Sequence, residues 1–252
     1  MMLRQLADRL LAVLLAPRCL ACGAPIDSPI AGPVCRSCWR TVVPISPPLC
    51  AVCGDALPTW RSPAAAGSRC GRCRVQPGAL TCSRAAGAYE GVLRHVIHGL
   101  KYEGRRTLAA PLGELMGARG TEVLRGADLA VPVPLHWRRQ HARGFNQADD
   151  LARHLGLPVV RALCRVRPTP PQSGLTAAGR RRNLRGAFAP PRRHRVGRRE
   201  HDPRIAGACV VIVDDVSTTG ATLEECARVL KRGGAREVRA LTAARALTRH
   251  GK

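Results

Sequence analysis

The chain has 252 residues, of which 41 are lysine or arginine and 17 are aspartate or glutamate, so its formal charge is +24. This length can bury the core of one α/β domain and leaves room for a small additional module. No apolar run approaches the ~20 residues of a membrane-spanning helix, which argues against a membrane span, and the large basic excess favours polyanionic partners such as nucleic acids or phosphorylated metabolites.

The first sixteen residues are expected to form an amphipathic helix. Their leucines at positions 3, 6, 10 and 14 follow helical spacing. Asp8 and Arg9 interrupt the apolar run, and an obvious small-x-small cleavage site is missing, which argues against a signal peptide. A processed signal sequence is the alternative to a helix over residues 1–16.

Eight of the twelve cysteines form four C-x-x-C pairs within the first 73 residues. Each such pair brings two thiolates to one point, which is half of a tetrahedral Zn2+ site. Gly23 and Gly54 follow the second cysteine of the first and third pairs, where the turn often needs a positive φ. The spacing predicts about two four-cysteine Zn2+ sites, formed by Cys19, Cys22, Cys35, Cys38, Cys50, Cys53, Cys70 and Cys73.

Neighbouring pairs would combine into a double zinc ribbon over residues 17–83. Interleaved pairing is the alternative that spacing leaves open, and a disulfide framework is a less favoured one, because adjacent C-x-x-C pairs are typical of metal sites. An all-thiolate site leaves no coordination position for a substrate, so we expect these metals to be structural.

Beyond residue 83, strand-like and helix-like segments alternate. Strands are expected over residues 85–89, 128–133, 157–166, 209–213 and 238–244, and helices over 91–120, 146–156 and 223–232. This alternation predicts an α/β domain over residues 84–252, with a mostly parallel sheet and helices on both faces. Residues 167–207 are strongly basic, and we expect a flexible loop followed by a mobile arginine-rich insert over 188–207, although compositional bias alone can also produce such a run.

Residues 210–222 read VVIVDDVSTTGAT, an apolar run followed by two acids and a glycine-containing turn. Ligands of parallel sheets bind beyond the carboxyl ends of the strands, where Asp214 and Asp215 fall. Two carboxylates can accept hydrogen bonds from the vicinal hydroxyls of a ribose, and a turn that starts a helix can bind a phosphate. The pattern predicts a phosphoribosyl-binding loop. An ordinary capped turn would account for Glu224 and Glu225 but not for the acid pair.

The segment 210–222 resembles the phosphoribosylpyrophosphate (PRPP) loop of type I phosphoribosyltransferases. Three further stretches are similar to the ComF/GntX family of competence-associated proteins, in which a zinc ribbon precedes such a domain. They read GLKYEGRR at 99–106, VPVPLHWRRQHARGFNQADDLA at 131–152 and RPTPPQSGLTAAGRRRNLRGAF at 167–188.

The resemblance implies a type I phosphoribosyltransferase fold and displacement of pyrophosphate from PRPP by a nitrogen nucleophile, with Mg2+ bound beside the sugar. Asp214 and Asp215 would be the catalytic pair. The 5′-phosphate loop would comprise Val216, Ser217, Thr218, Thr219, Gly220, Ala221 and Thr222.

Further roles follow from the same resemblance. Pyrophosphate would lie against residues 133–136, and a flexible loop over 167–188 would close over the reaction centre. The additional residues implied are Lys101, Val133, Pro134, Arg138, Arg143, Gly144, Asn146, Gln147, Gln172, Arg180 and Asn183. The acceptor and a general base stay unassigned.

Three functions are compatible with these observations: a phosphoribosyltransferase (a pentosyltransferase), a single-stranded DNA-binding competence protein, and a PRPP-sensing regulator without turnover. The expected partners are PRPP, single-stranded DNA along the basic surface, and other competence or DNA-processing proteins. Aromatic residues make up only 3% of the chain, so phosphate contacts would dominate DNA binding. Reduced, metal-binding cysteines favour the cytoplasm.

Overall fold

A four-stranded parallel sheet forms the centre of the molecule. The computed structural model describes residues 2–57, 68–168, 177–192 and 199–246. The strands are β1 (Cys82–Ala85), β2 (Leu129–Pro132), β5 (Cys209–Ser217) and β6 (Glu237–Arg245), in the order β1-β6-β5-β2. All three pairings are parallel, as the alternation of elements predicts.

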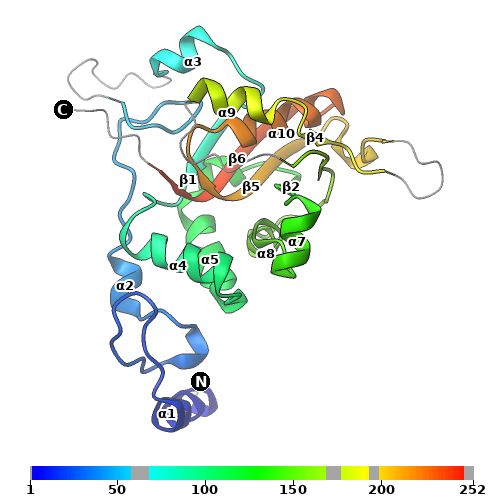
Figure 1. Cartoon of the computed structure of the whole chain (residues 1–252). Coiled ribbons are helices and arrows are strands. Elements are labelled where there is room, and N and C mark those ends of the chain that lie inside the picture. The colour runs from blue at the N-terminus through cyan, green and yellow to red at the C-terminus, as the bar shows by residue number, and fades with distance from the viewer. Residues whose placement is uncertain (1, 58–67, 169–176, 193–198, 247–252) are drawn as a thin grey trace.

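Helices cover both faces of this sheet (Figure 1). Helices α4 (Gly91–Tyr102), α5 (Ala109–Arg119) and α8 (Gln147–Ala152) pack on one face, and α10 (Ala221–Arg232) with α9 (Ala177–Leu184) packs on the other. Side chains of β5 alternate between the two cores: Val211 and Val213 face α4 and α5, whereas Val210 and Ile212 face α10. Strand β5 is therefore buried on both sides, which explains its continuous apolar run.

Several other elements are short. They include α6 (Thr121–Leu124), α7 (Trp137–Arg143), the antiparallel pair β3 (Cys164–Arg165) and β4 (Phe188–Ala189), and 3-10 turns over Pro29–Ala31, Arg106–Leu108 and Pro203–Ile205. The helix expected over 91–120 is divided between α4 and α5, with a left-handed glycine, Gly104, between them.

Two expected strands differ from those observed. The first strand runs over Cys82–Ala85 and not over residues 85–89. The strand expected over 157–166 is reduced to one parallel bridge between Val159 and Ala130, plus the two residues of β3. Ala130 exchanges both backbone hydrogen bonds with this segment, but the next donor on that edge would be Pro132, which has no N–H.

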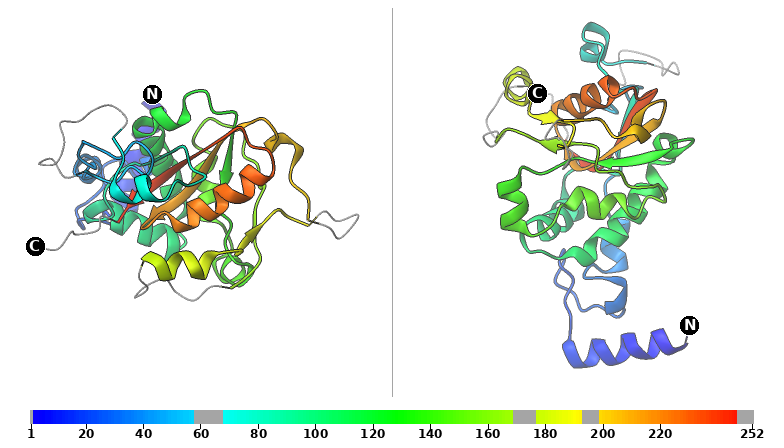
Figure 2. Two further views of the ribbon diagram at one scale, coloured as in Figure 1. Left: turned by 90° about the horizontal axis from the view of Figure 1, so that it is seen from above. Right: turned by 90° about the vertical axis from the view of Figure 1, so that its right-hand side faces the viewer.

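The two cysteine ribbons lie far apart. The first ribbon (residues 17–42) carries α2 (Arg36–Arg40) and lies with α1 (Met2–Leu15) on the side of α4 and α5, whereas the second ribbon (residues 48–75) carries α3 (Gly71–Val75) on the opposite side (Figures 1 and 2). The first ribbon shares the core of α4 and α5. Cysteines of the second ribbon form a separate small cluster.

Within the part of the chain that is described, no helix is both long enough and apolar enough to cross a bilayer.

Backbone contacts attach the second ribbon to the edge of the sheet. The Ser83 N–H of β1 donates to the Val52 carbonyl at 2.6 Å. Gly54 has a φ of +69°, and a Cβ at this position would lie 2.5 Å from the Ser83 carbonyl oxygen. Gly23, at the equivalent place in the first ribbon, has a φ of +73° but open space around it. The positive φ expected at both glycines is confirmed.

Alanine substitutions at these two glycines distinguish the cost of a left-handed φ from the cost of a steric clash with β1. Gly23→Ala is expected to lower the free energy of unfolding by about 1 kcal/mol, because only the left-handed φ is disfavoured. Gly54→Ala is expected to cost roughly 3 kcal/mol, because the methyl group also displaces the ribbon from β1. Urea unfolding of the zinc-loaded variants measures both, and equal losses would contradict this docking.

Candidate functional site

The acid pair lies within the last part of β5, at the carboxyl edge of the sheet. The strand continues through Asp214 and Asp215 to Ser217, four residues beyond the end at residue 213 that the sequence predicts. Asp215 is buried and pairs with Lys101 of α4, with 2.7 Å between Nζ and Oδ1. Burial alone would lower the pKa of Lys101, but the Asp215 carboxylate raises it, so the ammonium group stays charged.

A pocket of about 460 Å3 opens at this edge, between α4 and the start of α10. It brings the acid pair's loop together with Lys101 and Tyr102 of the stretch GLKYEGRR, although 112 or more residues separate them in sequence. The lining residues are Tyr89, Lys101, Tyr102, Asp214, Val216, Ser217, Thr218, Gly220, Ala221, Thr222 and Leu223. Of the seven residues expected to bind phosphate, Thr219 is the one that does not line it. Gly220 adopts a φ of +73° immediately before α10, so the loop leads directly into the helix N-terminus.

Buried polar atoms in this region lack protein partners. Asp215 Oδ2, Ser217 Oγ and Thr219 Oγ1 are buried and have no hydrogen-bond partner among the described residues. Ser217 lines this pocket, Asp215 is next in sequence to Asp214, which lines it, and Thr219 lines a smaller pocket on the other side of the loop. An unsatisfied buried polar atom is costly, so these atoms favour a ligand that completes them. Carboxylate acceptors, hydroxyl groups and a helix N-terminus together suit a sugar phosphate.

Asp214 is harder to ionise than an ordinary aspartate. Burial and the adjacent Asp215 carboxylate raise the pKa of Asp214 to about 7, although Lys101 acts in the opposite direction. The ionised form of Asp214 therefore needs additional positive charge. Mg2+ prefers carboxylate, hydroxyl and phosphate oxygens, so the carboxylates of this acid pair fit a magnesium ion.

The segment after β2 is fixed by hydrogen bonds to its neighbours. Val133 donates its N–H to the Val213 carbonyl at 2.9 Å and accepts from Asn146 Nδ2 at 3.0 Å. Asn146 also caps α8 by accepting the Ala148 N–H at 3.1 Å. Pro134 lines a second pocket of about 430 Å3 beside α7 and α8. The R-G-F-N-Q motif thus joins the end of β2 to the start of α8.

Two of the expected arginines lie against exposed aromatic rings. Arg143 donates to Gln147 Oε1 at 2.6 Å, and its guanidinium lies 5.6 Å from the centre of the Tyr102 ring. Tyr102 lines the pocket, so one aromatic side chain connects Arg143 with it. Arg138 lies 5.3 Å from the Trp137 ring and is further from the acid pair's pocket, since Trp137 lines the second pocket. Gly144 ends α7 with a φ of +77°.

The expected flexible loop is only partly described. Gln172 lies outside the described residues, and Arg180 lies in α9 with a side chain that is also outside them. Asn183, also in α9, has a buried Nδ2 without a partner among the described residues and is not one of the residues that line the pocket. Part of the insert expected to be mobile is folded: a 3-10 turn ends at Ile205, which is fully buried in the core of α10.

Arg165 is a residue that the sequence did not single out. It lies on β3, lines the second pocket and is close enough for its charge to lower the pKa of Asp214. Burial and the charge of Arg139 lower the pKa of Arg165 itself. Nothing distinguishes this arginine from its basic neighbours in sequence, because its position depends on the pairing of β3 with β4.

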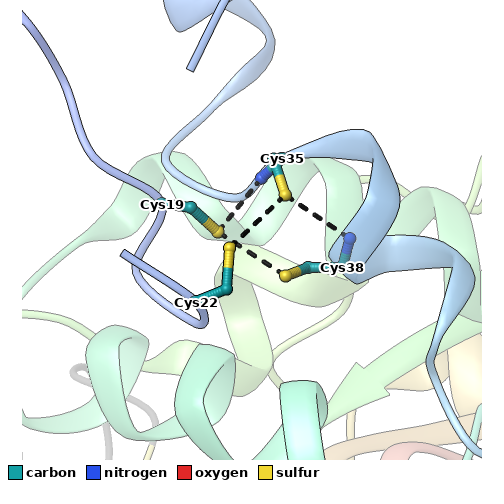
Figure 3. Close-up of side chains that lie close together, drawn as sticks. All are labelled: Cys19, Cys22, Cys35 and Cys38. Carbon is teal, nitrogen blue, oxygen red and sulfur yellow. Dashed lines mark hydrogen bonds between the residues drawn. The ribbon is translucent and has the colours of Figure 1, made fainter. Parts of the chain in front are cut away.

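The cysteines form two separate four-thiol clusters, each from neighbouring pairs. Figure 3 shows the first of them. In the first, the Sγ atoms of Cys19 and Cys38 are 3.8 Å apart, as are those of Cys22 and Cys35. A tetrahedral ion with Zn–S bonds of ~2.3 Å has sulfur–sulfur edges of about 3.8 Å, so the cluster fits Zn2+. Interleaved pairing is therefore excluded, and all twelve cysteines are free thiols and not disulfides.

Backbone amides prepare these thiols for a metal. Burial raises the pKa of Cys19, but N–H groups, first that of Cys35 at 3.3 Å, outweigh it and lower the pKa to about 6. Cys50 is equivalent in the second cluster: the N–H groups of Cys53 and Cys70 lower its pKa to about 6 against the effect of burial. Each cluster thus contains a thiolate at neutral pH, which is the form that binds Zn2+.

Family models match both parts of the chain. A double zinc ribbon domain matches residues 10–74, and a phosphoribosyl transferase domain matches residues 141–252. DNA utilization protein YhgH of Salmonella typhimurium strain LT2 is 36% identical over 222 residues, covering 80% of this chain and 93% of that one. Competence protein F of Haemophilus influenzae is 31% identical over 239 residues, covering 91% of this chain and 97% of that one.

A weak structural likeness is found to glutamine PRPP amidotransferase from B. subtilis. The TM-score is 0.34 with 21% identity, over 54% of this chain and 26% of the enzyme, so the chain spans about a quarter of that enzyme's length.

The raised pKa of Asp214 has a measurable consequence. The folded-state pKa of Asp214 lies above its ordinary value, so protonation favours the folded protein, and this stabilisation is lost as the pH rises through about 7. Asp214→Asn is therefore expected to stabilise the ligand-free protein, with a gain that grows by on the order of 2 kcal/mol between pH 5 and pH 8.

The matched control is Asp215→Asn, which leaves Lys101 buried without its partner and is expected to lose about 2–3 kcal/mol at both pH values. Chemical denaturation of both variants and the wild type at the two pH values measures these differences. If Asp214→Asn raised the free energy of unfolding equally at both pH values, the raised pKa of Asp214 would be contradicted.

Proposed function

Since this chain belongs to the ComF/GntX family, in which a double zinc ribbon precedes a phosphoribosyltransferase domain, we propose that it binds PRPP at the carboxyl end of β5 and transfers the phosphoribosyl group to a nitrogen acceptor. The observation that carries this proposal is the pocket in which the acid pair's loop, the N-terminus of α10 and Lys101 come together. The unpartnered Asp215 Oδ2 and Ser217 Oγ support it, because a sugar phosphate supplies both hydroxyl donors and phosphate acceptors.

Each part of PRPP would have its own contacts. Asp214 and Asp215 would accept hydrogen bonds from the ribose hydroxyls, and residues 216–222 would surround the 5′-phosphate with backbone N–H groups. The helix dipole of α10 adds favourable potential at this position. Arg143 lies against Tyr102, a residue of the pocket, and would use the rest of its guanidinium to bind the diphosphate on the opposite side of the sugar.

The chain's own groups can also assist bond cleavage. As the bond between C1′ and the pyrophosphate oxygen breaks, positive charge develops on the ribose ring, and the carboxylate of Asp214 would stabilise it. Mg2+, when bound with PRPP, neutralises charge on the leaving pyrophosphate. Lys101 pairs with Asp215 at 2.7 Å, and the carboxylates raise the pKa of Lys101 against the effect of burial. A new bond from the acceptor nitrogen to C1′ completes the transfer, and the nitrogen loses a proton.

Calorimetry with Mg2+–PRPP tests this proposal. The wild type is expected to bind, and Asp214→Asn is expected to weaken binding by about tenfold or more, because a charge-assisted contact is lost. Glu114→Gln, at an exposed position of α5, is the control and should bind like the wild type. Absence of binding by the wild type would refute the function.

Release of pyrophosphate in the presence of a panel of nitrogen nucleophiles then separates an enzyme from a regulator. Binding without release across the panel would favour a PRPP sensor that has no turnover.

Single-stranded DNA is a second candidate ligand, and one surface favours it. Trp137 and Tyr102 are 63% and 70% exposed, and each lies under an arginine, Arg138 or Arg143. Exposed rings beside guanidinium groups suit base stacking next to phosphate contacts. The formal charge of +24 adds long-range attraction. The relatives' names connect those proteins with competence and DNA utilization, so we extend this partner, and other competence or DNA-processing proteins, to this chain as a proposal.

A titration with single-stranded DNA at two salt concentrations checks the second candidate. We expect the affinity for single-stranded DNA to fall at least about tenfold when the salt concentration rises from about 50 to about 200 mM, because salt weakens phosphate contacts strongly over this range. At a given salt concentration, Trp137→Ala should bind DNA more weakly than the wild type. Val75→Ala is the control, because Val75 is 80% exposed on the second ribbon, and it should bind like the wild type. Weak binding that does not respond to salt would contradict this role.

The free thiols also bear on location. Two clusters of reduced cysteines fit a reducing compartment, and we propose the cytoplasm.

A further inference from the structure

The phosphate loop is a thin wall between two pockets. On one side lies the proposed PRPP pocket, and on the other lies a smaller pocket of about 100 Å3 that the second ribbon helps to form. Gly220 and Ala221 line both pockets, whereas Thr219 lines only the one on the ribbon side. A change in the second ribbon can therefore reach the loop directly.

Arg72 makes the direct connection. It lies between Cys70 and Cys73, in the short helix α3, and its Nη1 donates to the carbonyl oxygen of Thr219 at 2.6 Å. Its Nη2 lies 3.5 Å from Asp55 Oδ2 on the same ribbon. Two of the four thiolate ligands of the second cluster thus flank the arginine that holds the loop.

The same ribbon also contacts the strand beside the loop. Arg245, the last residue of β6, is 3% exposed and pairs in register with Ser217 of β5. Its Nε donates to Asp55 Oδ1 at 2.6 Å, and its Nη1 donates to the Cys53 carbonyl at 2.9 Å. Asp55 therefore connects Arg72, which reaches the middle of the loop, with Arg245, which lies next to its start.

A third contact holds the start of α10. The Ala79 N–H, shortly after the second ribbon, donates to Glu224 Oε1 at 2.6 Å. Gly78 lies so close to this carboxylate that a Cβ would overlap it. Glu224 therefore accepts a bond from a segment 145 residues away and does more than favour the helix dipole.

Peptide geometry shows what the Arg72 contact does for the pocket. In a planar trans peptide the carbonyl of one residue and the N–H of the next point in opposite directions. The Thr219 carbonyl points to Arg72, so the Gly220 N–H points away from the ribbon. It therefore faces the side of the loop on which the proposed PRPP pocket lies. Gly220 has a left-handed φ and no side chain, so without this bond its peptide could turn easily.

We propose that Arg72 is a positioning residue, through which the second cysteine cluster holds the phosphate loop in the geometry that binds a 5′-phosphate. This proposal rests on the function proposed above. Zn2+ held by the four thiolates would fix the turn that carries Arg72, so PRPP affinity would depend on the second cluster. The first cluster packs with α4 and α5 and has no contact with residues 217–221 in the described part of the chain.

The test compares Arg72→Met with Arg74→Met in the full-length, zinc-loaded protein. Arg74 is exposed on the same helix, and its side chain has no hydrogen bond to the described residues, so it controls for lost charge. Calorimetry with Mg2+–PRPP measures affinity, metal analysis measures zinc, and hydrogen exchange measures protection of residues 217–224. We expect Arg72→Met to raise the Kd about tenfold or more, to keep two zinc ions and to speed exchange in this segment, because a charged hydrogen bond is lost.

Arg72→Lys keeps the charge with a shorter reach, so we expect its Kd for PRPP to lie between those of the wild type and Arg72→Met. Ligand variants provide a second comparison: Cys70→Ser should loosen residues 217–224, whereas Cys22→Ser, in the first cluster, should not.

Two outcomes would overturn the proposal. One is an Arg72→Met protein with affinity and exchange like those of the wild type. The other is loss of zinc from Arg72→Met, which would show that Arg72 supports the cluster and not the loop. If the wild type binds no PRPP, the proposed function fails, but the exchange comparison still decides whether Arg72 orders the loop.

Discussion

The ion pair between Lys101 and Asp215 is the interaction on which the site depends. Two adjacent carboxylates at the end of a strand that is buried on both faces repel each other and lose hydration. Lys101, carried by α4, compensates one of them at 2.7 Å, and the other keeps a pKa near 7. Apolar packing places α4 against the sheet, and this contact joins the end of that helix to the acid pair at the edge of the pocket.

The two cysteine clusters have the same ligands but different attachments. The first adds apolar side chains to the core of α4 and α5, so its metal supports a packing surface. The second contributes little core and is attached by polar contacts, in which Asp55 and two arginines join it to the end of the sheet. Two copies of one motif can therefore serve packing in one place and orientation of a functional loop in another.

Sequence patterns predicted the parts of this protein that depend on local spacing. The four C-x-x-C pairs predicted two four-thiol clusters, and the apolar run with its acid pair predicted the central strand and its loop. Patterns could not predict Arg72 or Arg165, because each is one arginine among many and its partner lies far away in sequence. Thr219 illustrates the same limit: a motif shows that it belongs to the loop, but only the contact with Arg72 shows which way its carbonyl points.

Both edges of the sheet carry features that interrupt further strand pairing. At the outer edge of β2, Pro132 cannot donate the hydrogen bond that would extend the bridge at Ala130. At the outer edge of β1, the Ser83 N–H is already bonded to the second ribbon. Sheets of separate molecules join at unpaired strand edges. Pro132 on one side and the second ribbon on the other therefore hinder intermolecular strand pairing. The second ribbon thus also covers a strand edge at which another molecule would otherwise pair.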